Sequence, residues 1–162
     1  MALVFFIFLL LLIFIDFMVF HLDIELECTG TPGHGSLLHK NTAGEKIRYI
    51  IDKFMDLRSY EEKRLENNPE MLIGNVTTIN LTSLGGGVQS NVVPPELNAG
   101  FDVRIAIDVD HDELLAKVNK WCEEAGGGIN ISFSQKDPYV APTTIDDSNT
   151  YWNAFKSAIT EL

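Results

Sequence analysis

Apolar and polar residues alternate strictly from His21 to Cys28, so the apolar side chains fall on one face. A period of two predicts a strand with one buried face. The same period returns at 97–107 and at 129–134, and a β-rich but more polar stretch covers 75–82. We therefore predict four strands, and the polar composition of the second strand is typical of a sheet edge.

Two segments between the predicted strands carry apolar residues at helical spacing. The first follows Thr42, which forms a capping-box pattern with Glu45, and the helix ends before Pro69. Its later half, Arg58 to Asn67, is strongly charged, so we expect that half to be mostly solvated. The second helix follows the capping residue Asp110 and stops at the glycine triplet 126–128.

The order strand–helix–strand–strand–helix–strand, with one apolar face on every element, predicts an α+β fold in two layers. With right-handed crossovers this is a ferredoxin-like sandwich. Its antiparallel sheet has the order 4-1-3-2, and both helices cover one face. We assign 21–137 to this domain. Residues 138–162, a loop and the start of a helix whose apolar stripe has no obvious partner, begin another domain.

Residues 1–20 form a separate hydrophobic segment, which is unbroken as far as Ile15. A helix of twenty residues spans ~30 Å, enough to cross the apolar core of a bilayer. Two interpretations stay open: a hydrophobic helix that anchors the chain in a membrane, or a stretch that does not belong to the mature protein. The abrupt junction with a strand at His21 favours the second.

The charge and the cysteine content exclude several classes of function. The chain has 23 acidic and 12 basic residues and a formal net charge of −11. Such a charge repels nucleic acid and anionic lipid surfaces, so neither is an expected partner. The two cysteines, Cys28 and Cys122, are far apart in sequence and form no CxxC pattern. They are expected to be buried thiols, without a role in a disulfide or a metal site.

Three polar residues are candidates for chemistry. His34 lies in a loop with three glycines and a proline, a composition that can hold one side chain at a defined place. A neutral His34 can donate to an oxyanion, Asn91 can donate and accept, and Arg104 offers a planar fork for a carboxylate.

Each candidate also has a structural interpretation. His34 is equally compatible with an incidental side chain on a surface turn. Arg104 is compatible with a surface ion pair to Glu25, Glu27 or Asp102, which contributes ~0.2–1 kcal/mol to stability.

The sequence predicts no metal site. His21 and Asp23 form a His-x-Asp pattern on the polar face of the first strand, but no further ligand lies nearby in sequence. The pairs Glu61–Glu62 and Glu123–Glu124 imitate a base and a ligand, yet both are expected on solvated helix faces.

Three motifs, taken in order, resemble the lid or dimerisation domain of the zinc-dependent amidohydrolase family of aminoacylase-1. They are Gly30-Thr-Pro-Gly-His-Gly-Ser, Gly85-Gly-Gly-Val-Gln-Ser-Asn-Val-Val-Pro94 and Phe101-Asp-Val-Arg104. The stretch 143–152 also resembles the point where chains of this family re-enter the catalytic domain. The resemblance runs from about residue 21 to the end of the chain, and it implies a ferredoxin-like lid in a cytoplasmic enzyme.

The resemblance implies specific roles for the three candidates. A homodimer would form through 42–66 and 75–82, and His34 would stabilise the oxyanion in the partner's active site. Asn91 and Arg104 would bind the carboxylate of an N-acyl-L-amino acid, which the parent enzyme hydrolyses to a carboxylate and an L-amino acid.

The family's zinc ligands and general base lie in a catalytic domain on both sides of the lid, so we expect no cofactor in this chain and zinc in the parent enzyme. The chain is then a fragment that is inactive alone. The alternatives are a non-catalytic module that pairs with full-length subunits, or a form anchored in a membrane through residues 1–20.

Overall fold

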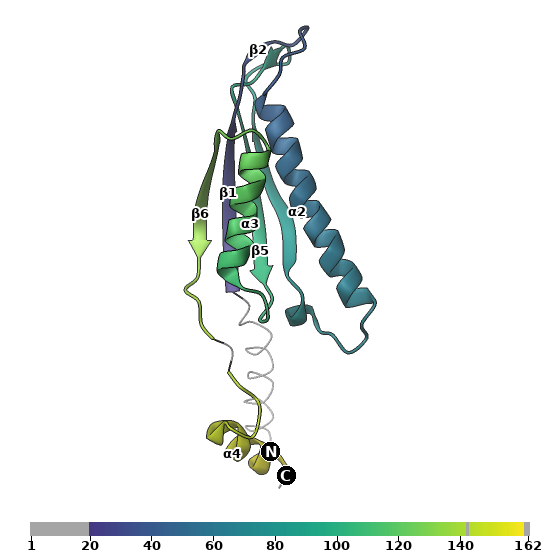
Figure 1. The fold of residues 1–162 in the computed structure, drawn as a ribbon, viewed down its shortest axis with the longest axis vertical. Coiled ribbons are helices and arrows are strands. Elements are labelled where there is room, and N and C mark those ends of the chain that lie inside the picture. Colours follow the sequence, from purple (N-terminus) through teal and green to yellow (C-terminus); the bar gives the residue numbers. More distant parts are fainter. Residues whose placement is uncertain (1–19, 142, 161–162) are drawn as a thin grey trace.

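The computed structural model describes residues 20–141 and 143–160. Four strands form one antiparallel sheet in the order β3-β5-β1-β6. The bounds of the strands are β1 Phe20–Thr29, β3 Thr78–Gly86, β5 Glu96–Ile105 and β6 Ile129–Lys136. Helices α2 (Ala43–Glu66) and α3 (His111–Glu124) lie across one face of the sheet (Figure 1). The α+β class and the predicted strand order are confirmed.

Both helices begin at the capping residues predicted from the sequence. The Thr42 hydroxyl accepts from the Glu45 amide at 3.2 Å, and the Glu45 carboxylate accepts from the Thr42 amide at 2.8 Å, which completes the capping box. Asp110 accepts from two amides of the first turn of α3. The glycine triplet after α3 has positive φ throughout, a conformation that ends a helix at little cost only in glycine.

Phe54 of α2 lies at the centre of the core. Its ring stacks on Phe101 of β5 at a centroid distance of 4.1 Å and meets the edge of Trp121 of α3 at 5.3 Å. The alternating apolar residues of β1 belong to the same cluster: Leu22, Ile24, Leu26 and Cys28. One continuous core therefore joins both helices to one sheet face, as the periodicity predicts.

Two strand boundaries and the exposure of two residues differ from the prediction. The edge strand begins at Thr78, because Ile73–Asn75 forms the short 3₁₀ helix η1. Ile107 is 54% exposed, because β5 ends at Ile105 and a turn follows. Within the charged half of α2, Glu61 is buried, so that half is not uniformly solvated.

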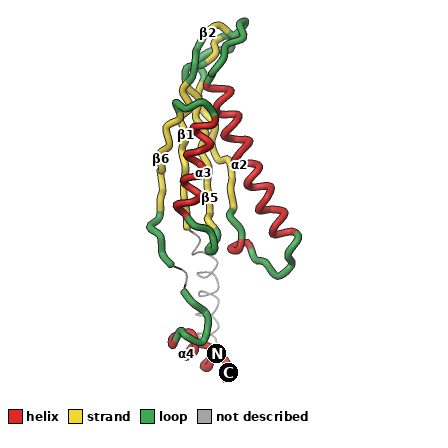
Figure 2. The backbone as a smooth tube through the Cα atoms, viewed as in Figure 1, coloured by secondary structure: helices red, strands yellow, loops and turns green. Residues whose placement is uncertain are grey.

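The hydrophobic segment 1–20 lies outside the described residues except for Phe20, which begins β1. Among the helices that the structure describes, none is long and apolar enough to cross a bilayer. Figure 2 shows loop backbone at 137–141 and 143–149, before α4 (Thr150–Thr160), the helix expected near the end of the chain. The division of the chain at residues 20 and 137 stays a prediction.

Candidate functional site

His34 and Asn91 are brought together by a two-stranded ribbon that the sequence did not predict. Strand β2 (Gly33–His34) pairs with β4 (Val92–Val93) in antiparallel register, with His34 opposite Val92. The Gly35 amide also donates to the Asn91 carbonyl at 2.7 Å. The ribbon extends beyond one end of the main sheet (Figure 1). The expected glycine-rich loop is therefore held by backbone pairing with the segment that carries Asn91.

The ribbon is joined to the sheet by close backbone packing at Gly30. A Cβ atom on Gly30 would lie 2.1 Å from the backbone nitrogen of Ala43. The Gly30 amide donates to the Pro95 carbonyl, and the Thr31 amide donates to the Asn41 carbonyl, both at 2.9 Å. Only glycine permits this approach, which fixes the ribbon against the start of α2.

Lys46 supports the base of the ribbon. Its side chain is 4% exposed, and its Nζ donates to the Thr29 carbonyl at 2.8 Å. The Thr29 amide and hydroxyl both donate to the Gly128 carbonyl, at 2.9 and 2.8 Å. The sequence contains no signal for this contact, because a single lysine on an amphipathic helix is usually solvent-facing.

Among the residues that the structure describes, the hydrogen bonds of His34 and Asn91 leave one nitrogen of each side chain without a partner. The Ser36 hydroxyl and amide lie 2.8 and 3.3 Å from His34 Nδ1, and an amide can only donate. This assigns Nδ1 as acceptor and places the proton of the neutral ring on Nε2. Gln89 donates to Asn91 Oδ1, so the Asn91 amide group is oriented with Nδ2 as its remaining donor. Both residues are exposed.

Arg104 lies at the opposite end of the sheet. It is eight residues beyond Glu96, the first residue of β5, which corresponds to about 26 Å along an extended strand. Its register partner on β1 is His21. Within one protomer, Arg104 is therefore far from His34 and Asn91. The reason is that one uninterrupted strand separates Arg104 from Asn91.

The guanidinium of Arg104 is paired with the carboxylate of Asp102. Nε donates to Oδ1 at 2.8 Å, and Nη2 donates to Oδ2 at 3.0 Å. Of the three acidic partners considered from the sequence, the structure selects the one on the same strand. The hydrogen bonds from Arg104 lower the pKa of Asp102, and the pairing raises the pKa of Arg104.

A family described as "Peptidase dimerisation domain" matches residues 21–130. The chain belongs to this M20 family. Aminoacylase-1 of Homo sapiens is 40% identical over 141 residues, covering 86% of this chain and 34% of that protein. Aminoacylase-1 of Mus musculus is 42% identical over 137 residues, covering 83% of this chain and 33% of that protein. The chain thus spans about a third of the length of these relatives, and the aminoacylase-1-like resemblance is confirmed.

Solved structures share the fold of this dimerisation domain. Aminopeptidase PepT from Bacillus cereus superposes with a TM-score of 0.56 at 16% identity, covering 88% of this chain and 35% of that one. A tripeptidase from Staphylococcus aureus superposes with a TM-score of 0.56 at 19% identity, covering 87% of this chain and 35% of that one. Membership in a dimerisation-domain family implies a dimer partner.

The resemblance to the aminoacylase-1 family implies zinc in the parent enzyme, and one set of side chains in the described part of this domain is close enough together to be compared with a zinc site. His21, Asp23 and Asp102 offer ligand atoms within 4.8 Å of one another. The third group comes from the neighbouring strand, which sequence spacing alone could not reveal. However, both oxygens of Asp102 accept hydrogen bonds from Arg104, so this carboxylate is already engaged by a cation. The set does not fit zinc.

One member of each glutamate pair makes structural contacts. Glu61 is buried and accepts from Arg64 at 2.7 Å and from the Thr77 amide at 3.4 Å, which corrects its expected solvation. Glu124 accepts from the Tyr49 hydroxyl at 2.7 Å and so links α3 to α2.

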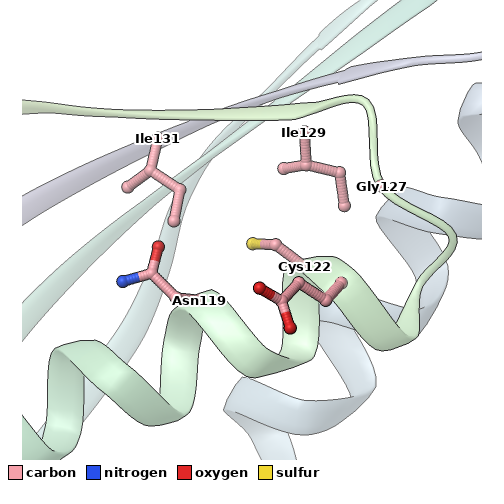
Figure 3. A pocket seen from close by; sticks show the side chains of 6 residues that line it. Asn119, Cys122, Gly127, Ile129 and Ile131 are labelled. Atoms are coloured by element: carbon pink, nitrogen blue, oxygen red, sulfur yellow. The ribbon is translucent and has the colours of Figure 1, made fainter.

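A shallow pocket lies between α3 and β6 (Figure 3). It is lined by none of the three candidate residues. Its lining residues are Asn119, Cys122, Glu123, Gly127, Ile129 and Ile131. The Cys122 thiol is buried, as predicted, and burial raises its pKa to about 11. A thiol with this pKa is protonated at neutral pH and is a poor nucleophile.

Proposed function

We propose that this chain is the lid and dimerisation domain of an aminoacylase-1-like, zinc-dependent amidohydrolase. The parent reaction hydrolyses an N-acyl-L-amino acid to a carboxylate and an L-amino acid. The observation that supports the proposal most is the exposed pair of His34 and Asn91 on a ribbon beyond the sheet, each with a donor that no other described residue occupies. In this proposal the chain is inactive alone, because the attacking water and the zinc belong to other polypeptide.

Each of the three polar residues has a distinct role in the proposal. His34 Nε2–H donates to the oxygen that becomes negatively charged when the amide carbonyl is attacked. This histidine acts in the active site of the partner subunit. Asn91 Nδ2 and the Arg104 guanidinium bind the carboxylate of the substrate, where charge-assisted hydrogen bonds give orientation as well as affinity.

The dimer surface in this proposal consists of α2 and the edge strand β3. Strand β3 pairs with β5 on one side, and its other side ends the sheet. Helix α2 lies along this edge, since Arg58 donates to the Ile79 carbonyl at 2.8 Å and also bonds Asn80. The two parts of the predicted surface, 42–66 and 75–82, are therefore neighbours on one protomer. The strand in this surface runs from Thr78 to Gly86.

Antiparallel pairing of two β3 strands accounts for the separation of Arg104 from His34. A twofold axis at this edge reverses the partner's sheet, so the Arg104 end of one protomer lies beside the ribbon of the other. The two β5 strands are then three strand spacings apart, or about 14 Å. We therefore assign His34 and Asn91 of a given site to one protomer and Arg104 to the other.

Mixed dimers test the proposal. The acceptor is full-length mouse aminoacylase-1 in which the lid histidine aligned with His34 is replaced by alanine. Addition of this chain should restore hydrolysis of N-acetyl-L-methionine, and chains carrying His34→Ala or Asn91→Ala should not restore it. Arg104→Ala in this chain should restore activity fully, since the acceptor's own arginine serves the restored site. Mixed dimers that form without any restored hydrolysis would contradict the proposal.

Mixed dimers without restored hydrolysis would favour the second candidate function, a non-catalytic module that pairs with full-length subunits. The observation in its favour is the open edge of β3, which provides pairing without chemistry. A cytoplasmic location and a membrane-anchored form both stay predictions, because residues 1–19 lie outside the described part of the chain.

A further inference from the structure

The polar face of the sheet carries a chain of contacts that ends at Arg104. His21 Nε2 lies 2.9 Å from Asp23 Oδ1 and 3.5 Å from Asp102 Oδ2. Asp102 then accepts both hydrogen bonds from Arg104 described above. The contacts cross from β1 to β5 because His21 is opposite Arg104 in the register and Asp23 is opposite Asp102. The His21 side chain is only 11% exposed, so packing holds the imidazole in place.

We propose that Asp102 is a positioning residue that aims the Arg104 guanidinium at a substrate carboxylate, and that His21 and Asp23 hold Asp102 in place. This inference rests on the carboxylate-binding role proposed above for Arg104. Neither the sequence motifs nor the comparisons assign a role to His21, Asp23 or Asp102.

The hydrogen bonds to Asp102 engage the side of the guanidinium formed by Nε and Nη2, and the end formed by Nη1 and Nη2 faces away from this carboxylate. A guanidinium has five N–H donors, and Asp102 accepts from Nε and from one hydrogen of Nη2. The other three donors, two on Nη1 and one on Nη2, make no hydrogen bond within the part of the chain that the structure describes. Two of them lie along the end of the fork, where a second carboxylate can bind in bidentate fashion.

The charges around Arg104 indicate that the orientation of its guanidinium matters more for binding a carboxylate than its net electrostatic attraction does. Asp23 and Asp137 also act on its charge, in addition to Asp102. Three carboxylates around one guanidinium give a local excess of negative charge, which opposes the binding of an anion. A carboxylate ligand can bind here only if directed hydrogen bonds offset that repulsion, and these require a fixed guanidinium.

A divalent cation is the competing occupant of the same cluster. His21, Asp23 and Asp102 are close enough to share an ion. An ion at that point would compete with Arg104 for the Asp102 oxygens and would lie beside a fixed positive charge. The observed pairing therefore favours the positioning role.

The first experiment measures the order of the guanidinium without ligand. In the full chain labelled with ¹⁵N, the Arg104 Nε–H signal should exchange slowly with water. Asp102→Asn should speed this exchange by at least about tenfold, because the amide offers only one acceptor atom. His21→Leu should speed it by a smaller factor, whereas His21→Gln should retain slow exchange because its amide nitrogen can replace Nε2. Unchanged exchange in Asp102→Asn, with an intact backbone amide spectrum, would overturn the proposal.

The second experiment titrates N-acetyl-L-alanine and follows the same signal. A positioning role predicts that Asp102→Asn weakens binding about three- to tenfold, even though the substitution removes a negative charge. If Asp102 only neutralises Arg104, the same substitution should tighten binding. Glu25→Gln is the matched control, since it removes one exposed charge from the same sheet face, and it should leave binding unchanged or slightly tighter.

Two further outcomes separate this inference from the function on which it rests. A wild-type chain whose Arg104 signal does not respond to N-acetyl-L-alanine contradicts the carboxylate-binding role, while the exchange experiment still decides whether Asp102 fixes the guanidinium. Saturable binding of Zn²⁺ that releases the Arg104 Nε–H signal and requires His21 would overturn the positioning role in favour of a metal site.

Discussion

Asp102 and Arg104 are two residues apart on β5 and pair through two hydrogen bonds of 2.8 and 3.0 Å. The pair lies on the polar face of the sheet, opposite the face that both helices cover. The pair therefore contributes to stability through electrostatic interactions, whereas the residues on the helix-covered face contribute through apolar packing.

Stability should lose the contribution of this pair at low pH. Hydrogen bonds from Arg104 lower the pKa of Asp102 from its ordinary value of 3.8, so the native state favours the ionised carboxylate. The contribution is complete above that ordinary value and is lost as the pH falls through the lower native value. The difference in unfolding free energy between wild type and Asp102→Asn should be constant from about pH 5 to 8 and should shrink below about pH 4. Urea unfolding at several pH values measures this difference in unfolding free energy. A difference that persists unchanged at pH 2 would show that the ionised Asp102 carboxylate is not its source.

Phe54→Ala should destabilise the domain by about 3–5 kcal/mol, because it leaves a cavity between Phe101 and Trp121. Tyr60→Ala on the same helix is the control, since Tyr60 is 59% exposed and its loss should change stability by less than about 0.5 kcal/mol. Chemical denaturation of both variants measures the effect. Equal losses would show that the core is not centred on Phe54.

Dimerisation should depend on β3 and not on the other edge strand. Thr82 is exposed and falls where the β3–β5 register shifts, so Thr82→Pro removes an amide without breaking an observed pair with β5. We expect the dimer dissociation constant to rise at least about tenfold, since one interstrand hydrogen bond and the strand geometry are lost. Ser134→Pro at the corresponding irregularity of β6 should leave dimerisation unchanged. Sedimentation velocity distinguishes the variants, and a greater loss with Ser134→Pro would place the interface on β6.

The two cysteines should be inert to thiol reagents in the native state. Burial raises the pKa of both Cys28 and Cys122 to about 11, so only about 0.1% of either thiol is ionised at pH 8. Labelling with a chromogenic disulfide reagent should therefore proceed only as fast as the domain opens, and denaturant should expose two thiols. Rapid labelling of one thiol in the folded chain would refute the prediction.

Local patterns were sufficient to predict the sheet and its helices. The caps at Thr42 and Asp110 and the alternation in β1 depend on neighbouring residues, and right-handed crossovers then leave one strand order. The burial of Glu61 could not be predicted in this way. It depends on the Thr77 amide, whose position is set by where η1 ends and β3 begins.

The candidate site was only partly predictable for the same reason. The motifs identified His34, Asn91 and Arg104, but the β2–β4 ribbon consists of two residues on each strand, too few for any periodicity. The contact between His21 and Asp102 depends on the register of two strands about eighty positions apart in the chain, and spacing along the sequence carries no information about that register.

The continuity of β5 makes this strand a spacer of fixed length between the ribbon and Arg104. Insertion of one residue would turn the guanidinium from the polar face into the core, since side chains alternate along a strand. Insertion of two residues would restore its face but displace it by about 7 Å. The length of this strand is therefore a requirement of the proposed carboxylate site.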